Sequence, residues 1–195
     1  MNSMSRSMVL ITSLLMSAGA AEAKKPANTV PPVKKDQAQI VFLRHSTVNA
    51  RLSTLLYDTT SGTPKVVGLM GNNRKLVVDV PPGDYVFMIG SMPYCDFMKA
   101  TVLPNKRYHV VVVPKWMNSY SMRPVRHQGG QFSYGSEDFA DIQKFTTLAG
   151  KAPASFVEEE LAKAEEDYAR KWAQWQNKLP EEKALLTLRP DDGET

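Results

Sequence analysis

The sequence is short of cysteine, of catalytic motifs and of long apolar runs. Among its 195 residues there is a single cysteine, Cys95, so an intramolecular disulfide is excluded. Cys95 also lacks the partner of a Cys-x-x-Cys motif, which favours a small buried apolar residue over a redox thiol. We therefore expect a fold that is held together by packing alone.

The motifs of hydrolases, metalloproteases and nucleotide-binding loops are also missing. The sequence contains no G-x-S-x-G, no H-E-x-x-H and no P-loop pattern, and no two of its three histidines have the close spacing of a metal-ligand pair. We therefore expect no catalytic residue, no cofactor and no metal. The rival hypothesis is a hydrolytic or metal-dependent enzyme with a site at one end of the fold, which would need at least two of these side chains to converge: His45, His109, His127, Asp79, Asp84 and Asp96.

The one apolar run lies at the N-terminus and is too short to span a bilayer. Residues 1–23 combine Arg6, an apolar stretch over residues 8–20 and the small-residue exit Ala21-Glu22-Ala23, which is typical of a secretory signal peptide. No cysteine follows the run, so a lipid anchor is not expected there. We predict a mature protein that starts near Lys24 and is periplasmic or secreted, with an uncleaved anchor as the alternative.

Charge is unevenly distributed along the chain. Residues 24–37 contain three prolines and four lysines and are predicted to form a flexible basic linker. Residues 24–157 carry seventeen Lys and Arg against eight Asp and Glu, whereas residues 158–195 carry six against eleven. Three interpretations remain open: the acidic tail docks on the basic body, the body meets an anionic envelope surface, or the charges are simply solvated.

Residues 38–127 are predicted to form an antiparallel β-sandwich of about seven to eight strands. Short runs rich in β-branched and aromatic residues recur at regular intervals, as in sandwich folds; they cover residues 38–44, 53–58, 64–70, 75–80, 84–90, 97–103, 108–114 and 120–125. Residues 59–63 and 71–73 supply the Gly and Asn that hairpin turns require. Pro81 to Asp84 predicts a type II turn with Gly83 at its third position.

The same stretch resembles a family of uncharacterised bacterial envelope proteins, many of them small lipoproteins. The resemblance rests on "AQIVFLRHS", "LLYD", "VVGLMGNNRKLVVDVPPGDYVF", "MKATVLPNKRYHVVVVP" and "YSMRPV". It implies an antiparallel β-sandwich and an envelope location, but no reaction. This chain departs from the family pattern at Asn105, where the family has glycine, and in lacking the lipid-bearing cysteine.

Residues 128–195 are predicted to form a loop followed by a helical region. Ser136 starts a short helix that carries Phe139, Ile142 and Phe145. A second helix is expected over residues 156–179, with Ser155 and Glu158 as a capping box and Pro180 as its end.

The second predicted helix carries an apolar stripe with a 4-3-4 spacing, which keeps the stripe on one face. Its members are Val157, Leu161, Ala164, Tyr168, Trp172, Trp175 and Leu179. The stripe packs on its own sandwich, pairs with another chain as a coiled coil, or lies on a membrane surface. Leu161, Tyr168, Trp172 and Trp175 are the candidate interaction residues.

Together these features predict an exported, non-catalytic β-sandwich protein that binds or scaffolds another component of the cell envelope. The expected partner is an envelope protein or an anionic envelope surface, and a homo-oligomer formed through the C-terminal helix is the further possibility. No nucleic-acid partner is expected.

Overall fold

The computed structural model describes residues 28–91, 93–116 and 119–195. Over these residues the chain is mainly β, with eleven strands in two mixed sheets and helices in its C-terminal part. The predicted signal peptide and residues 24–27 of the predicted linker lie outside the described residues. Among the helices of the described part, none has the length and apolarity needed to cross a membrane.

The two sheets are built from strands that lie far apart in the sequence. Sheet A has the order β10 (Thr147–Leu148), β4 (Arg74–Val80), β1 (Ala38–Arg44), β7 (Arg107–Pro114), β8 (Tyr120–Arg126) and β9 (Phe132–Ser133). Sheet B has the order β11 (Thr187–Leu188), β6 (Tyr94–Val102), β5 (Gly83–Ser91), β2 (Thr54–Asp58) and β3 (Lys65–Met70). All eight predicted strands are present, and their ends differ from the predicted ends by three residues or fewer.

The pairing of the strands is not wholly antiparallel, which corrects the predicted sheet type. At the centre of sheet A, β1 and β7 run parallel, in register from Gln39 opposite Arg107 to Leu43 opposite Val111. The short strands β9, β10 and β11 also pair in parallel. After β1 the chain forms β2 and β3 in sheet B and returns to sheet A for β4. It then forms β5 and β6 in sheet B and returns to sheet A for β7. This long crossover allows two parallel strands to become neighbours.

Two of the predicted turns connect different sheets. Residues 71–73 join β3 of sheet B to β4 of sheet A, and Pro81-Pro82 join β4 back to β5 of sheet B. Gly83 does have a positive φ, but its value of 149° differs from the value of about 80° at the third position of a type II turn. The predicted hairpin at residues 71–73 and the predicted type II turn are therefore wrong, whereas residues 59–63 do close the β2–β3 hairpin.

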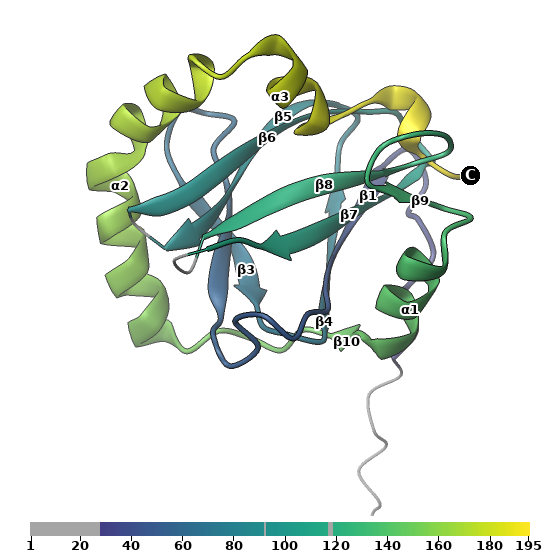
Figure 1. Ribbon diagram of the computed structural model, residues 1–195, viewed down its shortest axis with the longest axis horizontal. Coiled ribbons are helices and arrows are strands. Elements are labelled where there is room, and N and C mark those ends of the chain that lie inside the picture. The colour runs from purple at the N-terminus through teal and green to yellow at the C-terminus, as the bar shows by residue number, and fades with distance from the viewer. Residues whose placement is uncertain (1–27, 92, 117–118) are drawn as a thin grey trace, which may run out of the picture.

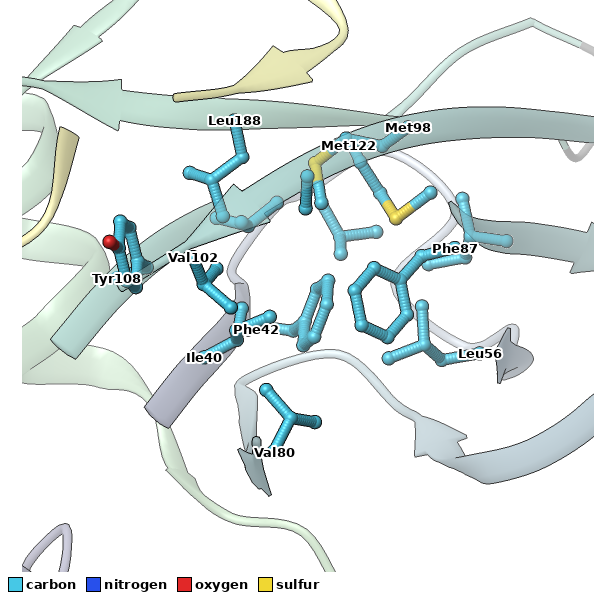
Figure 2. Close-up of a cluster of buried hydrophobic side chains, with 14 of the residues drawn as sticks. Ile40, Phe42, Leu56, Val80, Phe87, Met98, Val102, Tyr108, Met122 and Leu188 are labelled. Carbon is cyan, nitrogen blue, oxygen red and sulfur yellow. The ribbon is translucent and has the colours of Figure 1, made fainter. Parts of the chain in front are cut away.

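The main core lies between the two sheets (Figure 2). Phe42 of β1 and Phe87 of β5 meet edge to face with ring centroids 5.3 Å apart. Around them pack aliphatic and methionine side chains of both sheets, including Leu56, Met98 and Met122. Because β1 and β5 belong to different sheets, this aromatic pair joins the two layers directly.

The outer face of sheet A is covered by α1 (Glu137–Phe145). Ser136 caps this helix as predicted, and its hydroxyl accepts a hydrogen bond of 3.3 Å from the amide of Phe139. Phe139 and Ile142 are buried against Val41 and other side chains of the sheet. Phe145 does not join them, because its side chain is 48% exposed.

The outer face of sheet B is covered by α2 (Ala154–Gln176), on the opposite side of the molecule from α1 (Figure 1). The helix begins two residues before the predicted start, with Pro153 as its N-cap and no side-chain cap, so the predicted capping box at Ser155 is wrong. It ends three residues early, and Pro180 starts a further helix, α3 (Pro180–Leu185). A 3-10 turn, η1 (Pro190–Asp192), follows β11.

Six of the seven residues of the apolar stripe pack on sheet B, as the first of the three interpretations states. Phe97 of β6 contacts Tyr168, Trp172 and Trp175 with ring centroids 5.2–6.4 Å apart. Leu179 is the exception, because it follows the end of α2 and is exposed. Trp175 is 2% exposed, whereas Leu161, Tyr168 and Trp172 are half-buried.

The segments on either side of residues 38–127 are joined to the sheets. In the predicted linker, the carbonyl of Pro31 accepts a hydrogen bond from Arg107, and Lys34 pairs with Asp79 at 2.8 Å. Residues 128–195 contribute β9, β10 and β11 to the two sheets. The predicted boundary at residue 127 thus separates strands that share a sheet.

Replacement of Trp175 by alanine is expected to lower the free energy of unfolding by about 3–5 kcal/mol, because its indole is almost fully buried against Phe97. Trp172→Ala is expected to cost less, since that side chain is half-buried. Urea denaturation at two protein concentrations measures both effects and tests whether they are independent of concentration.

Trp116→Ala is the matched control, because the Trp116 side chain is 88% exposed and its loss should leave stability unchanged. Equal stability of the Trp175 variant and the wild type would contradict the packing of α2 on sheet B.

Candidate functional site

A cavity of about 280 Å³ lies where the ends of β6, β7 and β8 meet the C-terminal half of α2. Its floor is formed by Asp96 and Phe97 of β6, and one wall by Trp175 of α2. The walls come from three elements that are remote in sequence. They meet because α2 packs along sheet B and the two sheets approach each other at β6 and β8.

Asp96 is a buried carboxylate with several donors. It is 6% exposed and accepts hydrogen bonds from the amide of Phe97 at 3.0 Å, the hydroxyl of Ser121 at 3.1 Å and the ammonium of Lys115 at 3.3 Å. The ammonium of Lys178 lies 3.8 Å from Oδ1 of Asp96, the oxygen that also accepts from the Phe97 amide. A buried charge is stable only when it is paired in this way, so Asp96 holds two lysines beside the cavity.

The cavity has an excess of positive charge. Its walls include three lysines, Lys115, Lys171 and Lys178, and Asp96 is the one carboxylate among its lining residues. Lys171 forms no hydrogen bond or ion pair with any residue in the described part of the chain. A cavity of this kind attracts anions, because two of its cationic charges are not balanced within it.

Aromatic side chains surround the charged groups. Trp175 lies in the wall, and within the described residues its buried indole nitrogen has no hydrogen-bond partner. Trp116 follows Lys115 directly in the chain and is 88% exposed, and Tyr94 in the wall is 42% exposed. Exposed Trp and Tyr side chains of this type often carry much of the energy of binding sites.

Cys95 also lines the cavity, but its chemistry is that of an inert thiol. Burial is the main cause that raises its pKa to about 11, and the nearby Asp96 raises it further. The thiol is therefore protonated at neutral pH, and a protonated thiol is a poor nucleophile.

Of the histidines named by the enzyme hypothesis, His45 and His127 have separate polar partners, whereas His109 and His127 both contact the ring of Tyr134, with centroids 5.6 and 4.9 Å away. The ring nitrogen Nδ1 of His45 lies 2.6 Å from the amide oxygen of Asn73. His127 lies 3.5 Å from the carbonyl oxygen of Gly193. His109 is buried beneath α1. Among the described residues, no group of three His, Cys, Asp or Glu side chains is arranged to hold a metal ion.

The aspartates of that hypothesis are equally separate. Asp79 pairs with Lys34 and accepts a hydrogen bond from Gln39, and Asp84 accepts one from Thr101 at 2.6 Å. Within the described parts of the chain, no hydrogen bond or ion pair joins two of the six candidate groups. Asp96 is the one member of the set that lies in the cavity.

The lysines and Trp116 were missed at the level of the sequence. Lys115 lies in the connection between β7 and β8, Lys171 lies in α2, and Lys178 follows the end of α2. Because the three are far apart in the sequence, no local motif contains them. The one available signal was Trp116, a tryptophan next to a lysine in a connection between strands. Of the four interaction residues proposed from the sequence, Trp175 lines the cavity, whereas Leu161, Tyr168 and Trp172 lie outside its lining.

Comparison with protein-family models finds no family that matches this chain, and comparison with curated proteins finds no significant match. The resemblance to small envelope proteins therefore stays an expectation.

His109 is a buried base on β7, in the layer between sheet A and α1. It is 5% exposed, and its ring contacts Tyr134 and Phe139 with centroids 5.6 and 5.3 Å away. The carboxylate of Glu194 lies 3.6 Å from its Nδ1 atom, an arrangement that favours the protonated ring.

Burial and nearby positive charges favour the neutral ring of His109, and together they outweigh the attraction of Glu194. Burial lowers its pKa from 6.5 to about 4, and the positive charges of Arg107 and Lys75 act in the same direction. The carboxylate of Glu194 is 44% exposed, so water screens its attraction. The ring is therefore neutral in the folded protein at neutral pH.

Acidification is expected to destabilise the fold through His109. Its pKa is lower in the folded state than in the unfolded state, so its full contribution to stability is present above about pH 6.5. That contribution falls as the pH decreases towards 4, by about 3 kcal/mol in total. Urea denaturation of the wild type and of His109→Gln between pH 7 and pH 4 measures the difference.

The Gln variant should lose less stability than the wild type over this interval, because glutamine does not titrate. His45→Gln is the control, since His45 lies at a half-exposed position. An identical pH profile for His109→Gln and the wild type would show that His109 is not the buried base described here.

Proposed function

We propose that this chain is an exported, non-catalytic β-sandwich protein that binds an anionic component of the cell envelope in the cavity beside Asp96. The observation that carries the proposal is the arrangement of Lys115, Lys171 and Lys178 around a single buried carboxylate. The export part rests on the signal-like pattern of residues 1–23 and on the resemblance to envelope proteins. The binding part rests on the cavity.

The chemistry of the cavity supports binding over catalysis. Among the described residues, no hydrogen bond or ion pair joins two of the six candidate catalytic groups, and burial raises the pKa of the Cys95 thiol, which keeps it protonated. General acid–base and nucleophilic mechanisms need two or more such groups within hydrogen-bond reach. Lysine ammonium groups, by contrast, bind phosphates and carboxylates directly.

Each lysine has a distinct role in this proposal. Lys115 and Lys178 are oriented by Asp96, with ammonium-to-carboxylate distances of 3.3 and 3.8 Å. Lys171 has no described partner, so its charge is available to an incoming anion. Trp116 adds an exposed apolar surface beside the cavity that a sugar ring or a glycerol backbone can contact.

The homo-oligomer expected from the helical stripe has less support. The stripe is largely occupied by sheet B, and Trp175 is 2% exposed. Of the stripe, a second chain would reach Leu179 and the exposed parts of four half-buried side chains, Val157, Leu161, Tyr168 and Trp172. An interaction through α2 is therefore proposed for its C-terminal half, where Lys171 and Trp175 line the cavity.

Binding is tested with glycerol phosphate, which carries the phosphate group common to phospholipid headgroups and glycerol phosphate polymers. Titration followed by nuclear magnetic resonance should shift the amide signals of residues 94–97 and 171–178. Lys171→Gln is expected to weaken binding about tenfold, because a hydrogen bond to a charged group contributes about 1.5–3 kcal/mol. Added salt should weaken binding further.

Lys163→Gln is the matched control, since Lys163 lies on the same helix, is exposed and pairs with Glu159 at 2.7 Å. Equal affinity of the Lys171 and Lys163 variants would overturn the assignment of the cavity. A photo-crosslinking residue at position 116 in intact cells, with one at the exposed position 185 as the control, should then capture the envelope component selectively from position 116.

A further inference from the structure

A second cavity lies at the open edge between the two sheets. It measures about 470 Å³ and lies between β3, β4 and the connection from β10 to α2. β3 is the last strand of sheet B, and β4 is followed in sheet A only by the two-residue strand β10. Within the described chain no strand follows β3 at this edge of sheet B, and the connection from β10 to α2 closes the outer side of the cavity.

The walls of this edge groove are apolar. Val67 and Leu76 belong to the partly buried rim of the core between the sheets, and Val66, Ala152 and Val157 belong to the rim of the core beneath α2. The groove therefore lies where the two cores meet at the surface. Cavities of this size with largely apolar walls are typical of sites for small ligands.

Gly68, in the middle of β3, lets the Leu76 side chain of β4 pack directly on the strand at the floor of the groove. A Cβ atom at this position would lie 2.8 Å from Cδ2 of Leu76, so Leu76 already occupies the space that a side chain there would need. Glycine in a strand interior weakens the strand and often marks the close approach of another molecule or chain.

One charged side chain lines the edge groove, and it is a cation. Lys151 lies in the connection before α2, is exposed, and has no hydrogen bond or ion pair with the described residues. No acidic side chain lines the groove. The combination of an apolar trough with a single unpaired ammonium group matches a molecule with an apolar chain and one anionic end.

We propose that the edge groove binds a single-chain anionic amphiphile of the fatty-acid class. The acyl chain lies along Val67, Leu76 and Val157, and its carboxylate meets Lys151. The groove is distinct from the cavity beside Asp96, because Val157 lies near the start of α2 whereas Lys171 and Trp175 lie near its end. This site does not depend on the function proposed for that cavity.

The test uses laurate and, as its uncharged counterpart, dodecanol, both below their aggregation concentrations. Amide signals of residues 66–69, 76 and 149–157 should shift with either probe. Ala152→Phe fills the groove and is expected to weaken laurate binding more than tenfold. Ala169→Phe, at an exposed position of α2, is the matched control and should leave laurate binding unchanged.

The charge is tested separately by Lys151→Gln, an exposed substitution that leaves the core intact. It should weaken laurate binding by up to about fivefold, the range of a solvent-exposed ion pair, and leave dodecanol binding unchanged. Equal affinity of the Ala152 and Ala169 variants for laurate, or signal shifts confined to residues 94–97 and 171–178, would overturn the proposal. An equal effect of Lys151→Gln on both probes would overturn the role of the carboxylate.

Discussion

The rest of the structure depends on the burial of β1 on both of its faces. All seven residues of this strand are buried, with exposed fractions of 0–1%. One face meets sheet B, where Phe42 packs on Phe87, and the other is covered by α1. A strand that is apolar on both faces needs a layer on each side. The placement of α1 on one side of sheet A and of sheet B on the other follows from this requirement.

Two buried arginines, Arg44 and Arg126, fix loops and the C-terminal segment to the strands of sheet A. The guanidinium of Arg44, at the end of β1, donates hydrogen bonds to the carbonyls of Asn49, Leu52 and Met70 and lies 4.6 Å above the ring of Tyr120. Four loop and strand positions are thus fixed to one cation. These contacts compensate most of the cost of burying the charge, although within the described residues Nε of Arg44 has no hydrogen-bond partner.

Arg126 plays the corresponding part for the C-terminal segment. It pairs through Nη1 with both carboxylate oxygens of Asp192, at 2.9 and 3.0 Å, and donates to the carbonyls of Ala184 and Thr187. The segment after α2 is therefore held to sheet A by Arg126 while β11 extends sheet B. The acidic tail does dock on the basic body, through an ion pair buried on both sides. The cavity beside Asp96 owes its shape to the same closure of the C-terminal region on the sheets.

Local patterns determined which residues form strands and helices. Strand positions follow from runs of β-branched and aromatic residues, and the stripe from Val157 to Trp175 identified the face of α2 that is covered. Tertiary structure alone decided which strands are neighbours and why residues 71–73 and Pro81-Pro82 connect different sheets. It also decided that Lys115 and Lys178 pair with Asp96 and that Lys171 lines the same cavity. The physical reason is that periodicity reports the faces of one element. Pairing and charge clustering depend on the packing free energy of residues far apart in the chain, which no local window contains.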